Sequence, residues 1–330
     1  MLKDNIIKGL SLINIAMIFA GVIIISLTAC TPSHLSTPLS LSKTSKDKVP
    51  TNPNKQSSIR IYVQDDSDYA ITTRSIKASF ESIGLSIVSE NNLNEEFSTH
   101  FQALDYKAYY LSFFMNHNLS YKLIRKYPKF GLLTPLSMSI WVDKNNNMHI
   151  ATLSLSSMAK IADIPKDDKD LLAYSHLINK ALYTTMPKGE FKELPDAQND
   201  SHKLFIKEYK SVLKETVPVV ESELESELDI AGFFIPHYID LKESLFVRHD
   251  YDKYDYFHSY SICDLSALYD EAKQNPQMGA WSPCSFYIYK SKKSQNVVMG
   301  YVPVSMFTSK SKALTKSQGI LDNTLTQILE

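Results

Sequence analysis

The pattern of apolar and polar residues after residue 58 predicts short strands alternating with amphipathic helices. Ile59 to Val63 and Leu85 to Val88 are short, apolar-rich runs that indicate strands, and Ala108 to Met115 is a near-continuous apolar run typical of a central strand. Thr72 or Thr73 can cap a helix that ends at Gly84. We also expect helices over residues 118–126 and 168–183, a strand hairpin over residues 136–142 and 148–154, and a polar stretch over residues 89–97.

A ten-residue stretch occurs twice, 148 residues apart, as PKFGLLTPLS at 128–137 and PQMGAWSPCS at 276–285. Proline fixes φ and lacks an N–H, whereas glycine tolerates positive φ, so neither copy can form a regular helix or a central strand. Each copy should be a rigid loop that leads into a strand. The loop either presents Thr134 or Ser282 to a ligand, or is a structural turn that sets the entry of the strand, which we favour.

The repeat extends beyond these ten residues. Residues 76–158 align with residues 224–306 without a gap, and 14 of the 83 aligned pairs are identical. This identity is low, but the apolar positions also match in kind, so two copies of one fold are expected rather than a solenoid of short units. The predicted boundaries are a first repeat over residues 59–187, a connector over 188–201 and a second repeat over 202–330.

Two helices are expected early in the second repeat. The first, over residues 202–213, has no counterpart in the other copy, whereas the second, over residues 219–230, matches the first helix of the first repeat. Alternate residues on a helix point about 200° apart, so the alternating acidic residues of the second helix do not converge on a cation. We expect them to form a solvated face: Glu221, Glu223, Glu225, Glu227 and Asp229.

The N-terminal residues have the pattern of a secretory leader. Lys3 and Lys8 precede an apolar run from Gly9 to Leu27, and small residues lead to Cys30. The cysteine resembles the lipobox of bacterial lipoproteins, which implies a signal peptide over residues 1–29 and an acyl-modified Cys30. The alternative is an uncleaved membrane helix, since about 19 apolar residues can span a bilayer. Thr31 is not the aspartate that retains such proteins at the inner membrane, which favours the outer membrane, on its periplasmic face or at the cell surface.

Residues 30–58 are expected to form a flexible tether, because they contain no aromatic residue and are rich in Ser, Thr, Pro and Lys. Such a tether spans about 30 Å root-mean-square. The segment carries +3, whereas residues 59–330 carry −5. An acidic folded part does not fit nucleic-acid binding, which requires a basic face.

The segment from Asn116 to Asp143 resembles the bacterial family catalogued as domain of unknown function 302. Members show an asparagine after a strand, then a helix, a Pro-x-x-Gly turn, a second proline, and a strand that ends near Trp and Asp. His117 departs from this pattern, as do Tyr289 and Ser291 in the second copy. The resemblance covers about 83 residues per copy. It implies an α+β fold, here in two tandem repeats, each a small, mostly antiparallel sheet with helices packed on one face. It also implies frequent dimers, hence a possible homodimer, and it implies no reaction. The matching residues are Asn116, Pro128, Gly131, Pro135, Trp141 and Asp143.

Two cysteines occur only in the second repeat. Cys263 and Cys284 stand where the first repeat has Met115 and Leu136. In an oxidising envelope they could form a disulfide, and two buried thiols are the alternative. They are not a Cys-x-x-Cys pair, so a thioredoxin-like redox role is not indicated.

The stretch from His249 to Tyr260 is rich in His, Asp and Tyr. These residue types can bind a transition metal or stack on a sugar, but no paired-histidine spacing is present, and we expect no metal. An exposed aromatic loop that contacts a partner is the preferred interpretation. The candidate contact residues are His249, Tyr251, Tyr254 and His258.

No nucleophile elbow, P-loop or HExxH motif occurs, and nine glycines provide no glycine-rich phosphate loop. The sequence therefore favours a non-catalytic, cofactor-free envelope protein that binds a small ligand or an unknown envelope protein. Two alternatives stay open: an envelope enzyme or redox accessory acting through Cys263 and Cys284, and a surface adhesin.

Overall fold

The computed structural model describes residues 58–192, 207–212, 216–281, 285–303 and 311–329. Asn52–Glu330 form one compact unit that contains both repeats. The predicted leader, Cys30 and nearly all of the tether lie outside the described residues, so the lipid anchor stays a prediction. Within the described ranges, no helix is both long enough and apolar enough to cross a bilayer.

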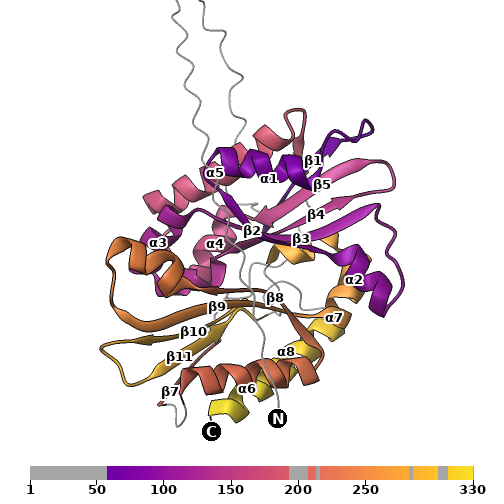
Figure 1. Ribbon diagram of the computed structural model, residues 1–330. Coiled ribbons are helices and arrows are strands. Elements are labelled where there is room, and N and C mark those ends of the chain that lie inside the picture. Colours follow the sequence, from indigo (N-terminus) through magenta and orange to yellow (C-terminus); the bar gives the residue numbers. More distant parts are fainter. Residues whose placement is uncertain (1–57, 193–206, 213–215, 282–284, 304–310, 330) are drawn as a thin grey trace, which may run out of the picture. The chain divides into compact units, whose positions relative to one another are not determined.

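The first repeat is an antiparallel sheet with the strand order β2-β3-β4-β5-β1-β6. Its helices α1 and α5 lie over one face of this sheet (Figure 1). The elements in chain order are β1 (Ile59–Asp65), α1 (Thr73–Ser82), β2 (Ser86–Asn92), α2 (Leu93–His100), β3 (Ala108–Met115), α3 (His117–Lys126), the 3₁₀ helix η1 (Pro128–Leu133), β4 (Leu136–Val142), β5 (Asn147–Leu153), α4 (Leu155–Ala162), α5 (Lys169–Thr185) and β6 (Glu190–Lys192).

The second repeat follows the same path, with the strand order β7-β11-β10-β9-β8 and with α6 and α8 over one face (Figure 1). The expected α+β architecture of two tandem repeats is therefore confirmed. Its elements are β7 (Lys207–Ser211), α6 (Val217–Ile230), β8 (Phe233–Asp240), the π-helical turn η2 (Lys242–Phe246), the 3₁₀ turn η3 (Val247–His249), β9 (Tyr254–Asp264), α7 (Leu265–Ala272), the 3₁₀ helix η4 (Pro276–Trp281), β10 (Ser285–Ser291), β11 (Val297–Tyr301) and α8 (Lys312–Leu329).

One prediction near the boundary between the repeats was wrong, and another missed a short strand. The helix expected over residues 202–213 is contradicted by β7, which pairs with β11. The connector expected over residues 188–201 contains β6, which pairs with β1 between Ile61 and Val63. In both cases hydrogen bonds to a strand far along the chain override local preference. The helices α2 and α4 were also missed, and α2 covers most of the stretch expected to be only polar, because each has eight residues and only two or three large apolar positions to define a period.

Both faces of the first sheet are buried, although only one carries helices. Ser137 and Ser139 on β4 point away from α1 and α5, and both are fully buried. This second face packs against the other repeat: Phe113 stacks on His237 of β8, with ring centres 5.5 Å apart. The polar side of the alternating strand is therefore an interface and not a solvent face.

Alanine substitutions at two glycines should change the free energy of unfolding in opposite directions. Gly84 ends the first helix with φ +84°, a conformation that costs an alanine about 1–2 kcal/mol. Gly319 lies within α8, and a Cβ there would meet no atom within 4 Å. Gly84→Ala should therefore lower the free energy of unfolding, whereas Gly319→Ala should raise it by about 0.5–1 kcal/mol through helix propensity. Urea denaturation of both variants checks this, and a shift in the same direction for both would contradict it.

Candidate functional site

The repeated Pro-x-x-Gly turns join the two repeats. In the first repeat, η1 packs on β9 and β10 of the second, while η4 packs on β4 and β5 of the first. The hydroxyl of Ser259 donates to the carbonyl oxygen of Gly131 at 3.0 Å. In the reverse direction, the hydroxyl of Tyr109 donates to the carbonyl oxygen of Pro276 at 2.9 Å. Each turn thus docks on the sheet of the other copy, which explains why the same stretch recurs.

The glycine of each turn is required by close approach. A Cβ at Gly131 would lie 2.7 Å from ring carbons of Phe257, and a Cβ at Gly279 would lie 2.6 Å from the hydroxyl of Ser139. Contacts this short do not occur at real Cβ atoms. Neither turn has room for a larger residue at this position.

The burial of Thr134 contradicts the interpretation that the loop presents it to a ligand. Thr134 is fully buried, and its hydroxyl donates to the carbonyl oxygen of Phe130 at 3.1 Å. The structural turn, the interpretation that we favoured, accounts for this residue. Ser282 lies outside the described residues, so its role stays a prediction.

Two of the aromatic residues expected in an exposed loop contact the first repeat, and one of these, His249, is exposed as expected. His249 stacks on Tyr121 of the first repeat with ring centres 3.9 Å apart, and Tyr251 contacts the same ring edge-on at 5.8 Å. Tyr254 is only 6% exposed, which contradicts its expected role as a surface contact. The guanidinium of Arg125 lies 5.9 Å from the centre of the Tyr121 ring. We call these ring contacts the aromatic seam; they pack α3 against the segment before β9.

An equivalent seam occurs on the other copy at the same sequence shift of 148. Tyr269 aligns with Tyr121 and stacks on Phe101, the counterpart of His249, at 4.6 Å. Lys273, the counterpart of Arg125, lies 3.9 Å from the centre of the Tyr269 ring. Because both copies repeat the arrangement with different ring types, we interpret His249 as an inter-repeat packing residue.

A polar cluster lies between α6 and the strands β8 and β9, and we call it the His258 cluster: Glu221, Tyr238, Asp240, His258 and Tyr260. The Nδ1 atom of His258 donates to Oε1 of Glu221 at 2.5 Å, and its Nε2 lies 3.6 Å from Oδ2 of Asp240. The hydroxyl of Tyr260 donates to the same Glu221 oxygen at 2.7 Å. Tyr238 is 46% exposed and lies 4.8 Å from the Tyr260 ring, so the cluster reaches solvent.

The cluster holds His258 in its charged form at neutral pH. Burial disfavours the imidazolium, but the interactions with Asp240 and Glu221 outweigh burial and raise the pKa of His258 to about 9. Burial and the bond to Glu221 also raise the pKa of Tyr260 above its ordinary value, so its phenol stays a neutral donor. The result is an imidazolium between two carboxylates.

The cluster belongs to the second repeat alone. The first repeat has Thr73, Asn92 and Tyr110 at the positions of Glu221, Asp240 and His258. The prediction of a wholly solvated acidic face was wrong at Glu221, because its side chain is only 12% exposed and pairs with His258. The two copies therefore share their interface but differ on this outer surface.

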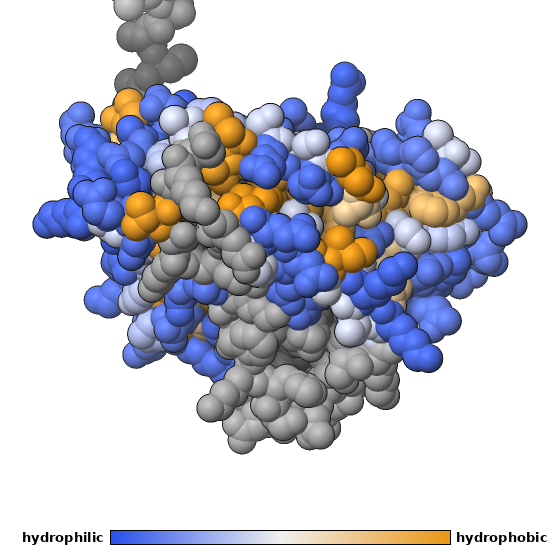
Figure 2. Space-filling model, turned by 90° about the horizontal axis from the view of Figure 1, so that it is seen from below, coloured by the Kyte–Doolittle hydropathy of each residue, from blue (hydrophilic) through white to orange (hydrophobic). Residues whose placement is uncertain are grey.

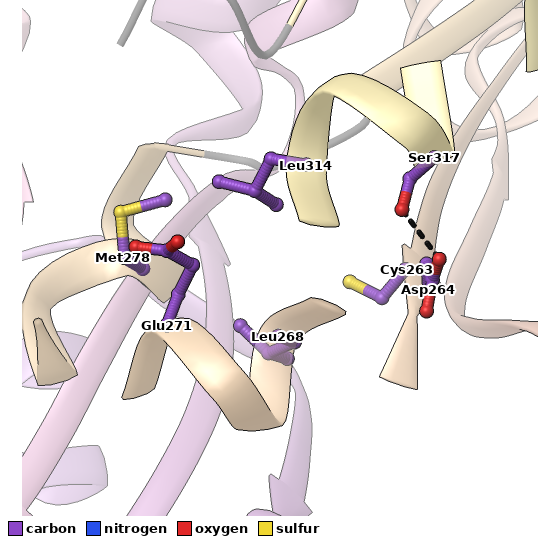
Figure 3. Close-up of a pocket in the computed structure, with 7 residues that line it drawn as sticks. All are labelled: Cys263, Asp264, Leu268, Glu271, Met278, Leu314 and Ser317. Carbon is purple, nitrogen blue, oxygen red and sulfur yellow. Dashed lines mark hydrogen bonds between the residues drawn. The ribbon is translucent and has the colours of Figure 1, made fainter. Parts of the chain in front are cut away.

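Cys263 lines a cavity of about 10 Å³ at the end of β9 (Figure 3). Its sulfur is directed into the cavity, and the carboxylates of Asp264 and Glu271 come from α7 and its start. This volume holds at most one water molecule. Cys284 lies outside the described residues, so the disulfide between the two cysteines stays a prediction.

The cavity has a counterpart in the first repeat that aromatic rings fill. There the rings of Phe130 and Tyr174 pack with centres 5.8 Å apart. Met278 aligns with Phe130. Ser317 on α8 takes the place of Tyr174: its hydroxyl donates to Asp264 at the start of α7, whereas the Tyr174 hydroxyl accepts from the backbone N–H of Asn116 at the start of α3. Smaller side chains thus leave the gap in the second copy.

The Trp and Asp of the family pattern fasten the β4–β5 hairpin. One oxygen of Asp143 accepts from the backbone N–H groups of Asn145 and Asn147, and the other lies 3.0 Å from Nε2 of His149. Burial opposes ionisation of Asp143, but hydrogen bonds, chiefly from Asn147 and His149, hold its pKa at about 2. Trp141 stacks on His149 at 4.6 Å. These residues therefore have a structural role in the turn.

The described part of the chain contains no group of three or more His, Cys, Asp or Glu residues placed to hold a metal ion. The two histidines of the His-rich stretch have different surroundings. His249 stacks on Tyr121 of the first repeat, whereas His258 bonds to Glu221 of α6. The structure does not bring them together.

Comparisons with known proteins identify the repeated unit. A family profile described as "Domain of unknown function DUF302" matches residues 61–182 and residues 209–330. A crystal structure of an uncharacterized conserved DUF302 protein from Bacillus stearothermophilus aligns with 37% of this chain and 98% of its own, at 16% identity and a TM-score of 0.32. No curated protein matches the chain.

Proposed function

The chain belongs to the DUF302 family and carries two copies of its domain, and from that premise we propose that it is a lipid-anchored cell-envelope protein that binds a partner without catalysis. The binding surface in this proposal is the His258 cluster of the second repeat. The partner is an envelope protein or a small ligand that contacts Tyr238.

The observation that carries the proposal is the difference between the copies. Both repeats use the sheet face opposite the helices to pack on each other, which leaves the outer surfaces for other contacts. On the helix-bearing side of the second repeat, a mostly buried charged pair lies beside an exposed tyrosine, and the first repeat has neither charge at the aligned positions. An exposed aromatic residue held by a rigid sheet is typical of binding surfaces.

The exposed apolar residues around the His258 cluster are too dispersed to favour non-specific hydrophobic association. Among the residues coloured in Figure 2, most are hydrophilic, and the apolar ones form separate patches. On α6, Val219 is 48% exposed and Ile230 is 76% exposed, at opposite ends of the helix. Scattered apolar residues of this kind do not form one large hydrophobic patch.

The Cys263 cavity supports the non-catalytic part of the proposal over the redox alternative. With room for one water molecule at most, it admits no substrate to the sulfur.

A photo-crosslinking amino acid at Tyr238 tests the proposed surface in living cells. We expect a specific crosslinked species with this variant and none with the same substitution at Glu90, the exposed counterpart in the first repeat. Equal crosslinking at both positions, or none at either, would contradict the proposal.

The anchor is tested separately by metabolic labelling with an alkyne fatty acid. The wild-type protein should carry the label and fractionate with membranes, whereas Cys30→Ala should lose both properties. Label on Cys30→Ala would show that the anchor is elsewhere.

A further inference from the structure

Arg60 is a buried cation that the mutual packing of the repeats does not use. It lies on β1 and faces α5. Its Nε donates to the carbonyl oxygen of Leu153 at 3.0 Å, and its Nη1 donates to Ser175 Oγ at 3.2 Å and to Asn179 Oδ1 at 2.6 Å. All three acceptors are neutral.

The remaining nitrogen of Arg60 has no partner. Nη2 is buried and makes no hydrogen bond, and among the described residues no carboxylate forms an ion pair with this side chain. Burial lowers the pKa of Arg60 to about 10, which is still well above neutral pH. A buried guanidinium normally has an anionic partner, because leaving such a charge unpaired is costly.

The groups around Arg60 also have hydrogen-bond donors. Ser175 and Asn179 each use an oxygen to accept from Arg60, which leaves the Ser175 hydroxyl hydrogen and the Asn179 amide N–H groups to donate elsewhere. Tyr183, one turn further along α5, adds a phenol that is 47% exposed. These α5 residues recur at every fourth position, so they lie on one face of the helix.

No acidic group on this part of α5 competes for Arg60. The helix has a single carboxylate, Asp170 in its first turn, and that group pairs with Lys122 and Lys126. The charge and the donors at Arg60 therefore match an anion.

We propose that Arg60, Ser175 and Asn179 form a binding site for a phosphate group, with Arg60 Nη2 as its charged donor. A planar guanidinium with free N–H groups matches the oxygens of phosphate, and hydroxyl and amide donors complete the set. The phosphate belongs either to a soluble ligand or to a lipid headgroup. The site does not depend on the proposed function of the His258 cluster.

Thermal unfolding of the full-length mature protein in a neutral detergent tests the site. Inorganic phosphate is one probe, and vesicles of phosphatidylglycerol, compared with vesicles of an uncharged glycolipid, are the other. Ligand that binds the folded state raises its melting temperature in proportion to the logarithm of concentration. A response to inorganic phosphate assigns a soluble ligand, and a response only to phosphatidylglycerol assigns a headgroup. No response to either probe overturns the proposal.

Two variants link any response to Arg60. Arg60→Met should weaken binding at least about tenfold, since it removes the charge-assisted bonds. Asn179→Asp places a carboxylate beside Arg60 with little change in shape, so it should raise the melting temperature without ligand and abolish the response. Arg74→Met, at an exposed arginine on α1, is the control and should respond as the wild type does. A full response from Asn179→Asp would overturn the site even if Arg60→Met failed to fold.

Discussion

Gly131→Val is expected to destabilise the folded chain by about 3 kcal/mol, because it forces the docked turn off the second sheet. A Cβ at this position would lie 2.7 Å from two ring carbons of Phe257, and that ring is fully buried. Overpacking of a filled core costs about 1–3 kcal/mol for small additions, and valine adds two further carbons. Urea denaturation followed by far-UV circular dichroism measures the loss.

The neighbouring ring provides the control for Gly131. Phe257 also packs against Phe246, Tyr254 and Tyr289, so it has little freedom to move. If the collision with this ring is the cause, Gly131→Ala combined with Phe257→Leu should be less destabilising than the two single changes added together. Strict additivity, or a wild-type melting curve for Gly131→Val, would contradict the docking of η1.

Glu221→Ala is expected to cost about 2–3 kcal/mol and to change how stability depends on pH. The substitution removes the carboxylate that accepts from both His258 and Tyr260, whose side chains lie beneath α6. The change removes one of the two carboxylates that hold the imidazolium and leaves Asp240, 3.6 Å from Nε2 of His258, and the lost pair is only 12–13% exposed, so its removal is costly. Glu225→Ala, an exposed position on the same helix, should change stability by less than about 0.5 kcal/mol.

The sign of the pH effect follows from the raised pKa of His258. Folding raises this pKa from about 6.5 to about 9, so the folded state holds the proton more tightly. The stabilisation is complete below pH 6.5 and is lost as the pH rises through 9. After allowance for solvent screening of a partly exposed group, it amounts to about 2 kcal/mol.

Urea denaturation between pH 6 and pH 10 measures this effect. The wild-type free energy of unfolding should fall across that range, and the fall should be smaller in Glu221→Ala, where Asp240 alone of the two carboxylates still raises the pKa of His258. Equal slopes in the two proteins would show that Glu221 does not hold the proton on His258.

Local elements of the first repeat could be predicted because their signals lie in neighbouring residues. The central strand β3 matches its expected bounds, Thr72 caps α1 as expected, and Gly84 follows that helix with positive φ. The hairpin after the repeated stretch was also confirmed, and the stretch leads into its first strand as expected, although it is a 3₁₀ helix and not a loop. Each of these depends on periodicity, a cap, or the fixed φ of proline, all of which act within a few residues.

The candidate site could not be predicted in the same way. The alternating acidic residues of α6 indicated a solvated face, and nothing near Glu221 shows that His258, 37 positions later, bonds to it. The burial of Tyr254 and the stacking of His249 on Tyr121 likewise depend on the other repeat. The 148-residue spacing between the copies was the available sequence signal. It identifies equivalent residues of the two repeats, but it does not predict that these residues pack across the interface.

By itself, the sequence determined the duplication, the order of most strands and helices, and the position of the Pro-x-x-Gly turns before a strand, because local backbone preference and apolar spacing act within each segment. The tertiary structure alone decided that those turns dock on opposite sheets, that Ser137 and Ser139 are buried, and that residues 207–211 form a strand. These outcomes arise from contacts between residues far apart in the chain, where burial and strand pairing outweigh local preference.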